Sequence, residues 1–286
     1  MKHKIMYFHI GDPEFVVQSI KQTHHWNPDS DIYLIGDVPP EETKDIVKFY
    51  DYQDLICQSG SNFMKNFVNL SSNNADFEKI CIFRWFAIKE LCRKENIEKI
   101  FYMDSDIMLY CKLEEELSKF QNTRYALSNG SSAAVFCVND ITVLEDYCRY
   151  VDGFYDDSQV NNTFTLREHT RLFAHIREDI TSFYTNRTKF KLPGGVCDMT
   201  FWGELKKIDD PLMVGEISGV RERTTFDHNI NAPDFFEFEN GKKKISWENG
   251  QPYVYNTYLK DKIRFNSLHF QGYDSKVLMK KHCSYE

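Results

Sequence analysis

Two carboxylates separated by one residue follow an apolar segment: Asp104-Ser105-Asp106 comes directly after Phe101-Tyr102-Met103. We expect a strand there, and residues at the end of a buried strand lie where an α/β sheet opens to ligand. Magnesium and manganese prefer oxygen ligands and often share carboxylates with phosphate oxygens. A cation held there would act as a Lewis acid on a diphosphate leaving group. A bare D-x-D also arises by chance, and its place after an apolar strand favours the metal interpretation.

The second chemical signal lies far along the chain, in residues 268–276, which read LHFQGYDSK. The imidazole of His269 suits manganese, and Lys276 can pair with phosphate as a point charge. Gly272 would let the backbone approach a ligand closely. A lone histidine is most often structural. Together with the D-x-D triplet, however, this segment predicts a clamp for a metal ion and a diphosphate.

The elements that must position these residues follow a βαβα order, which predicts a parallel sheet covered by helices. We expect an irregular loop over 59–75 and hairpin turns at 240–241 and 249–250. The predicted strands span 4–8, 31–35, 99–103, 124–128 and 133–138, and the predicted helices 14–24, 41–49, 77–93, 141–151, 166–180 and 198–206.

The turns after the first two strands are candidate nucleotide contacts, because ligands bind beyond the carboxyl ends of parallel strands. His9 and Gly11 lie in the first turn, and Asp37 lies in the second. Ordinary βα turns account for each of these residues equally well when it is taken singly.

The helix over 77–93 carries an arginine on its apolar side. Arg84 lies four residues from both Ile80 and Ile88, so it projects toward the buried stripe. A buried guanidinium needs an anionic partner, and Asp104 or a donor phosphate is the expected one. The alternative is an arginine at the edge of the stripe that reaches water. The predicted buried residues of this helix are Ile80, Phe83, Ala87, Ile88 and Leu91.

Composition excludes several classes of function. With 42% hydrophobic and 27% charged residues, the 286-residue chain is expected to fold, and its net charge of -8 disfavours nucleic acid as a partner. The triplet 242–244 of lysines is interpreted as one side of a solvated turn. No secretory signal or membrane-length apolar stretch is visible, and the eight cysteines form no C-x-x-C pair. We therefore expect a cytoplasmic protein with reduced core cysteines.

Four segments, taken in order, resemble nucleotide-sugar glycosyltransferases of the GT-A fold, especially the glycogenin- and galactosyltransferase-like branch and related bacterial and viral enzymes. They are FRWF at 83–86, YMDSD at 102–106, GGVCD at 194–198 and HFQGYDSK at 269–276. The last resembles the family's H-x-x-G-x-x-K motif for metal and diphosphate, although three residues rather than two separate Gly272 from Lys276.

The resemblance implies a role for each matched residue. Asp106 and His269 are the implied metal ligands, and Asp104 contacts the metal or the donor ribose. Asp198 is the implied acidic residue beside the donor sugar. Where the family has a D-Q-D triplet, this chain has 198–200 as DMT, so the donor sugar and the stereochemistry stay open.

Asp198 could instead have a purely structural role. It stands at an expected helix start after Gly194-Gly195, where a carboxylate is favoured by the helix dipole, so it could be an N-cap. As a functional residue it would deprotonate the acceptor in an inverting enzyme, or orient the sugar in a retaining one. Glu204 and Glu216 are the competing carboxylates.

These signals predict a GT-A-type, Rossmann-like α/β fold: a mostly parallel sheet flanked by helices, with a C-terminal β-hairpin region. We expect one catalytic domain over 1–286, whose 1–140 half binds the nucleotide sugar and whose 141–286 half holds the acceptor site and the C-terminal metal motif. The expected activity is transfer from a nucleotide-diphosphate sugar, a UDP sugar first, to a glycan or other hydroxyl acceptor, with Mn2+ or Mg2+. The acceptor site is expected at 59–75 and 227–258. The alternatives are a nucleotidyltransferase acting on sugar phosphates, and an inactive carbohydrate-binding relative.

Overall fold

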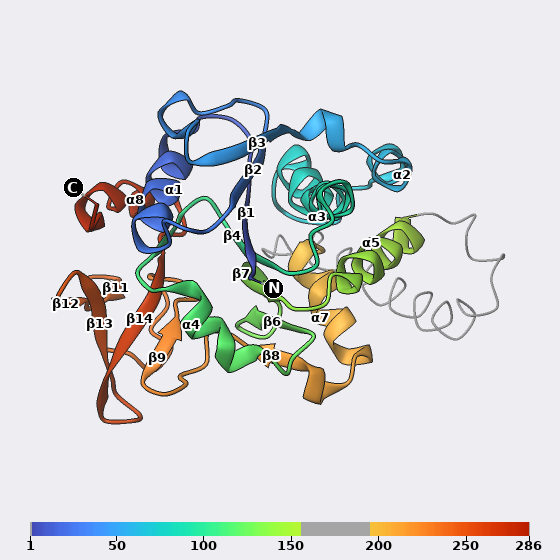
Figure 1. Ribbon diagram of the computed structural model, residues 1–286. Coiled ribbons are helices and arrows are strands. Elements are labelled where there is room, and N and C mark those ends of the chain that lie inside the picture. Colours follow the sequence, from blue (N-terminus) through green and yellow to red (C-terminus); the bar gives the residue numbers. More distant parts are fainter. Residues whose placement is uncertain (1, 156–194, 286) are drawn as a thin grey trace. The chain divides into compact units, whose positions relative to one another are not determined.

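The computed structural model describes residues 2–155 and 195–285 (Figure 1). The helix expected over 166–180 and residue Gly194 lie outside the described residues. The chain divides into two compact units: unit 1 comprises Met1–Asp54, Ile97–Asp140 and Asp210–Glu286, and unit 2 comprises Leu55–Asn96 and Ile141–Asp209. Within the described ranges, no helix has the length and apolar character needed to cross a membrane.

The larger sheet of unit 1 has seven strands in the order β3-β2-β1-β4-β7-β6-β8. From β3 to β4 all neighbours are parallel, whereas β7 is antiparallel to β4 and β6. The mostly parallel sheet predicted from the sequence is therefore confirmed. The strands are β1 Lys4–His9, β2 Ile32–Gly36, β3 Val47–Asp51, β4 Ile100–Met103, β6 Tyr125–Ser128, β7 Ser132–Val138 and β8 Val214–Glu216.

Continuous apolar runs place the middle of this sheet in the core. Every residue of β2 and β4 is buried, which is typical of parallel strands covered on both faces. Two helices of unit 1, α1 (Glu14–Trp26) and α4 (Leu113–Leu117), contribute their apolar residues to the same core. The free thiols of Cys111 and Cys137 also lie in it, and burial raises the pKa of each.

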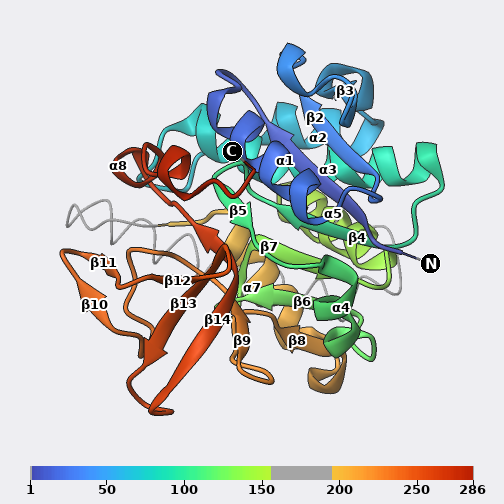
Figure 2. The ribbon, with the colours of Figure 1, turned by 60° about the vertical axis from the view of Figure 1, so that its left-hand side comes forward.

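A second, smaller sheet of unit 1 has the order β12-β13-β14-β5, with β9 paired to β14 (Figure 2). Asn240-Gly241 and Asn249-Gly250 form the two predicted hairpin turns, and all four residues have positive φ. The remaining strands of unit 1 are β5 Ile107–Leu109, β9 Thr224–Phe226, β10 Phe238–Glu239, β11 Lys242–Lys243, β12 Ser246–Glu248, β13 Gln251–Asn256 and β14 Asp261–His269, and its last α-helix is α8 Tyr273–Lys276.

Unit 2 is helical and has an aromatic core. Within the described part of unit 2, the α-helices are α2 Gln58–Asn66, α3 Ala75–Glu95, α5 Thr142–Tyr155 and α7 Asp198–Ile208. Trp85, Tyr147 and Trp202 are buried and pack together, with Tyr147 stacked on Trp202 at 4.2 Å between ring centroids. Asn74 caps α3 by accepting two backbone N–H groups, and Asn96 ends it in the left-handed region.

Two predictions of local structure are wrong. The helix expected over 41–49 is a short 3-10 turn, Glu41–Thr43, followed by β3. Its β-branched and aromatic residues extend the parallel sheet at its edge, and this pairing outweighs helical spacing. The irregular loop expected over 59–75 begins with helix α2, in which Phe63 is buried and provides the apolar anchor.

Candidate functional site

The D-x-D residues form a tight turn between two strands of unit 1. β4 ends at Met103, and the N–H of Asp104 donates to Ala134 O of β7 at 2.8 Å. The N–H of Ile107 donates to Asp104 O at 3.2 Å, and β5 starts at Ile107. Ser105 is half-buried within this turn. The turn therefore presents both carboxylates at the end of the sheet, as the sequence predicted.

Strand register brings His269 to this turn from the far end of the chain. β14 pairs antiparallel with β5, and His269 lies opposite Ile107. The next residue, Phe270, donates its N–H to Asp106 O at 2.9 Å. Because backbone pairing fixes the contact, the histidine stands beside the carboxylate whatever its side chain binds.

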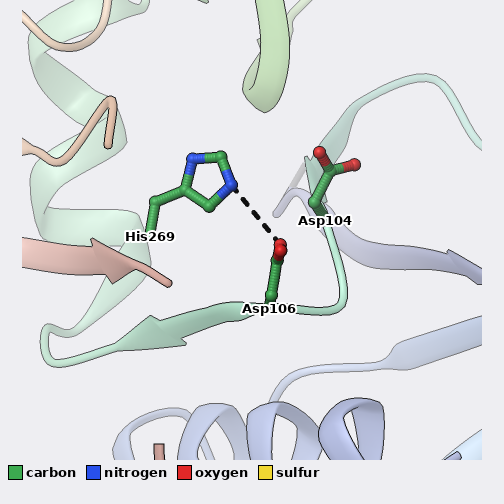
Figure 3. Close-up of side chains that lie close together, drawn as sticks. All are labelled: Asp104, Asp106 and His269. Carbon is green, nitrogen blue, oxygen red and sulfur yellow. Dashed lines mark ion pairs between the residues drawn. The ribbon is translucent and has the colours of Figure 1, made fainter. Parts of the chain in front are cut away.

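Asp104, Asp106 and His269 form a compact group of potential metal ligands (Figure 3). One ligand atom from each residue lies within 4.8 Å of the other two. Asp106 and His269 are buried, and Asp104 is half-buried. Two carboxylate oxygens and one imidazole nitrogen suit Mn2+, and Mg2+ would use the carboxylates. The residues that the sequence singled out as metal ligands thus lie together and fit such an ion.

The charges of this group are strongly coupled. Burial raises the pKa of Asp106, but His269 at 3.4 Å and Lys276 at 3.3 Å outweigh burial and hold this pKa below its usual value. Burial lowers the pKa of His269, and Asp106 with Asp104 reverses this and raises it to about 9. Without a metal ion, the site therefore holds a proton on His269, which a cation must displace.

Backbone and side-chain bonds orient the His269 ring. His269 Nδ1 lies 2.6 Å from the carbonyl oxygen of His228, so Nδ1 carries the proton in the neutral ring and Nε2 faces Asp106. The backbone N–H of His269 donates to Asp227 Oδ2 at 3.1 Å. These supporting residues were missed from the sequence. The available signal was the pair Asp227-His228 directly after a short strand, Thr224–Phe226, and the two threonines make it a weaker signal than the apolar strand before the D-x-D turn.

The interpretation of 242–244 as a solvated turn is wrong for its middle lysine. The Lys243 side chain is 1% exposed, and it donates to Asp227 Oδ1, Asn229 O and Asp234 Oδ2 at 2.6–2.9 Å. Alternation along β11 turns this lysine inward, and three donors meet three acceptors. Lys243 therefore fixes Asp227, which in turn holds His269.

The N-terminal candidates meet at the carboxyl edge of β1 and β2. Gly11 N–H donates to Asp37 Oδ1 at 2.9 Å, and His9 Nε2 lies 2.7 Å from Asp12 O. Burial lowers the pKa of His9, and the charge of Lys276 lowers it further, so Lys276 lies within electrostatic reach. Gly11 has φ +97°, which explains glycine in this turn.

The C-terminal motif closes on the same edge. Gly272 precedes α8, and its carbonyl oxygen accepts the N–H of Lys276 at 3.1 Å. The Lys276 ammonium lies 5.8 Å from the centroid of the Phe15 ring on α1. Unit 1 thus gathers nearly all of the predicted metal and nucleotide residues around one end of its sheets.

The two predicted catalytic residues lie in unit 2, and they pair with each other. Arg84 of α3 forms an ion pair and hydrogen bond with Asp198 Oδ2, and both side chains are largely buried. Cys197 is the N-cap of α7, so Asp198 occupies the first helical position and is not the cap. Asp198 Oδ1 accepts the N–H of Met199 at 2.9 Å. The sequence did not suggest this pairing.

A buried carboxylate and a glycine hold the segment that leads to Asp198. Gly195 pairs with Ser71, and a side chain there would collide with the backbone of Leu70 and Ser71. Ser71 Oγ donates to Glu78, which also accepts from Asn73 at 2.6 Å. Burial raises the pKa of Glu78. The glycine is therefore explained by this close approach of two backbones.

The competing carboxylates have structural partners. Glu204 pairs with Lys207 one turn later on α7. Glu216 accepts the backbone N–H groups of Asn129 and Gly130 at 2.9 and 2.7 Å, and it also accepts from Ser218. Glu216 thus stabilises the turn between β6 and β7, and its oxygens are already engaged.

Comparison with known proteins gives structural likeness at low identity. No protein-family profile matches the sequence. No curated protein matches it either. Apo mouse xyloside xylosyltransferase 1 shares 12% identity over 76% of this chain and 85% of its own, with a TM-score of 0.41. The galactosyltransferase LgtC, solved with donor and acceptor sugar analogues, shares 10% identity over 78% of this chain and 76% of its own, with a TM-score of 0.37. A Leptospira borgpetersenii cytidylyltransferase shares 11% identity over 64% of this chain and 74% of its own, with a TM-score of 0.34. Since these TM-scores lie below 0.5, the function is argued from the residues of the site.

Proposed function

We propose that the chain is a metal-dependent glycosyltransferase that moves a sugar from a nucleotide-diphosphate sugar to a glycan or another hydroxyl acceptor. The observation that carries this proposal is the group Asp104, Asp106 and His269, which the sequence separates by more than 160 positions and the fold brings within 4.8 Å. Lys276 adds a positive charge beside it. Ligands for a cation together with a charge for phosphate suit a diphosphate better than either does alone.

The residues of unit 1 would divide the work of holding the donor. Asp106 and His269 would bind the ion, and Asp104 would share it or contact the donor ribose. The ion would stabilise the negative charge that develops on the departing diphosphate. Lys276 would pair with a phosphate oxygen, since binding of the ion to Asp106 releases the ammonium from its present partner.

The edge formed by His9, Gly11 and Asp37 would receive the nucleoside. The carboxylate of Asp37, which accepts the Gly11 N–H with one oxygen, and the imidazole of His9 converge there, and both kinds of group can bond to a ribose or a base. Mn2+ is the proposed ion because imidazole is among the ligands. UDP is the proposed nucleotide because the resemblance of the motifs points to it.

In unit 2, Arg84 and Asp198 would serve the sugar-transfer step. The guanidinium fixes the Asp198 carboxylate and balances its charge, which preorganises that carboxylate before substrate arrives. In an inverting reaction Asp198 would deprotonate the acceptor hydroxyl, and in a retaining reaction it would orient the donor sugar.

The experiment is a screen of nucleotide sugars with the purified chain. Release of nucleoside diphosphate is measured with Mn2+, with Mg2+ and with EDTA, and sugar 1-phosphates with nucleoside triphosphates are included. The proposal expects turnover of one donor class that EDTA abolishes and Mn2+ restores. Turnover of sugar phosphates with release of pyrophosphate would identify a nucleotidyltransferase instead and would contradict the proposal.

A further inference from the structure

Unit 1 contains a cavity that the metal group does not use. Its volume is about 590 Å³, which falls within the about 300–1,000 Å³ typical of small-molecule pockets. It lies among the β6–β7 turn, the segment after β9 and the end of β13. Among its lining residues are Asn129, His228, Phe235, Asn256 and Tyr258.

The pocket begins next to the metal group. His228 lines it, and the backbone oxygen of His228 bonds to the His269 ring. Asp227 also lines it and holds the backbone N–H of His269. A ligand in this pocket would therefore be separated from the proposed metal ligand His269 by the residues that contact it, Asp227 and His228, and all of these lie in unit 1.

Two aromatic rings stand exposed at the pocket. Phe235 is 72% exposed and Tyr258 is 77% exposed, and their ring centroids lie 6.0 Å apart. The next residue, Phe236, is buried against Phe265. Since this short segment already has a buried anchor, the outward rings contribute little to the core. Exposed, adjacent aromatic rings at a cavity are typical of a binding surface.

The fold holds these rings in place at a conformational cost. Asp234 and Phe235 both have positive φ, which is uncommon for non-glycine residues and above all for a bulky one. Lys243 binds the side chain of Asp234, and Thr257 donates twice to Phe235 O, at 2.7 and 2.8 Å. Asn256 Oδ1 accepts the N–H of Tyr258 at 3.1 Å. Backbone strain that is stabilised in this way often accompanies a ligand site.

The charge of the lining selects among ligands. Glu216, Asp227 and Asp234 contribute three carboxylates, against the single ammonium of Lys243. That ammonium is already engaged by two of these carboxylates. An anionic ligand would be repelled. The amide of Asn129 and the imidazole of His228, whose Nδ2 and Nε2 atoms lie 3.2 Å apart, are uncharged polar groups that can bond to hydroxyls.

We propose that this pocket binds the acceptor, and that the acceptor is an uncharged glycan. One face of a sugar ring is lined by C–H groups, which pack on aromatic rings, while its hydroxyls bond to polar groups at the ring edge. Phe235 and Tyr258 supply the apolar surface, and Asn129 and His228 supply polar atoms. The inference rests on the proposed function and identifies the substrate class of the same site.

The test uses the full chain and two kinds of readout. Saturation-transfer NMR measures binding without nucleotide or metal. Its panel holds methyl glycosides and disaccharides of neutral hexoses, pentoses and N-acetylhexosamines, together with sialylated and sulfated glycans. Steady-state kinetics with a turned-over donor measures KM for the acceptor and for the donor. The variants are Phe235→Ala, Tyr258→Ala and the double variant, with Phe235→Tyr retaining a ring. Tyr255→Ala is the matched control, because Tyr255 is 37% exposed and does not line the pocket.

We expect the double variant to lose the NMR signal and to raise the acceptor KM by about tenfold, which corresponds to about 1.4 kcal/mol. The donor KM should stay constant, and Phe235→Tyr and Tyr255→Ala should behave as the wild type. Wild-type binding by the double variant, or a preference for sialylated or sulfated glycans, would overturn the inference. If no nucleotide sugar is turned over, the proposed function fails, while the NMR result still decides whether the pocket binds glycans.

Discussion

Lys243→Met should destabilise the fold far more than the same change at the next residue. Lys243 is buried with all three of its donors bonded, and its partner Asp227 is 0% exposed. Methionine replaces the apolar stem of the lysine but not its ammonium group, so the Asp227 carboxylate stays buried without its cation. Breaking a buried ion pair in this way costs about 3–5 kcal/mol.

Lys244→Met is the matched control. The Lys244 side chain is 58% exposed, and its nearest carboxylate, Glu239, is 3.9 Å away and also exposed. Exposed pairs contribute about 0–1 kcal/mol. Urea unfolding of both variants measures the difference, and the double variant Lys243→Met/Asp227→Asn should recover part of the loss.

The same perturbation should weaken metal binding, because Asp227 holds the backbone of His269. Calorimetric titration of Mn2+ into folded Lys243→Met at low temperature measures this second effect. If Lys243→Met and Lys244→Met unfold at the same urea concentration, the buried network does not exist as described, and the link from Lys243 to the site is refuted.

Three further predictions concern other parts of the molecule. Because a proton must leave His269 before a metal binds, Mn2+ affinity should rise about tenfold per pH unit from about pH 6.5 toward the raised pKa of about 9. The metal-free fold should lose stability over that same pH range, since the folded state holds a proton on His269 that the unfolded state has released. An Mn2+ affinity that levels off at pH 7 would exclude the raised pKa of His269. Gly195→Ala should destabilise unit 2 by about 1–3 kcal/mol, whereas Gly153→Ala, with open space around it in α5, should stabilise it by up to about 1 kcal/mol in thermal melts. Arg84→Lys keeps the charge but loses the planar guanidinium whose Nη2 bonds to Asp198, so kcat should fall about tenfold or more with little change in melting temperature. Unchanged kcat would leave Arg84 a structural residue.

The sequence predicted the elements whose signals are local. Apolar runs such as 100–103 predict strands by composition alone. The Asn-Gly pairs predict hairpins because both residues adopt positive φ. The helix of 77–93 was found by its spacing, although Ile80 at its start is half-buried rather than buried. The helix predicted over 41–49 was wrong because the structure of this segment depends on its pairing with a neighbouring strand, and no local sequence pattern records that pairing.

The candidate site was predictable only in part, for the same reason. Asp104, Asp106 and His269 stood out because their residue types suit a metal ion. Their proximity comes from the β14–β5 register, which sequence spacing does not contain. Lys243 was misjudged because a lysine triplet after a turn normally lies in water, and only the inward face of β11 shows otherwise.

The central claim is that Asp106 and His269 bind one divalent ion that in turn holds a nucleotide diphosphate. The most direct measurement is calorimetric titration of Mn2+ into the chain, with and without UDP, for the wild type, Asp106→Ala and the exposed control Asp45→Ala. We predict one Mn2+ site in the wild type and in Asp45→Ala, tightened by UDP, and no detectable site in Asp106→Ala although it melts as a folded protein. Unchanged Mn2+ and UDP affinity in Asp106→Ala would contradict the claim.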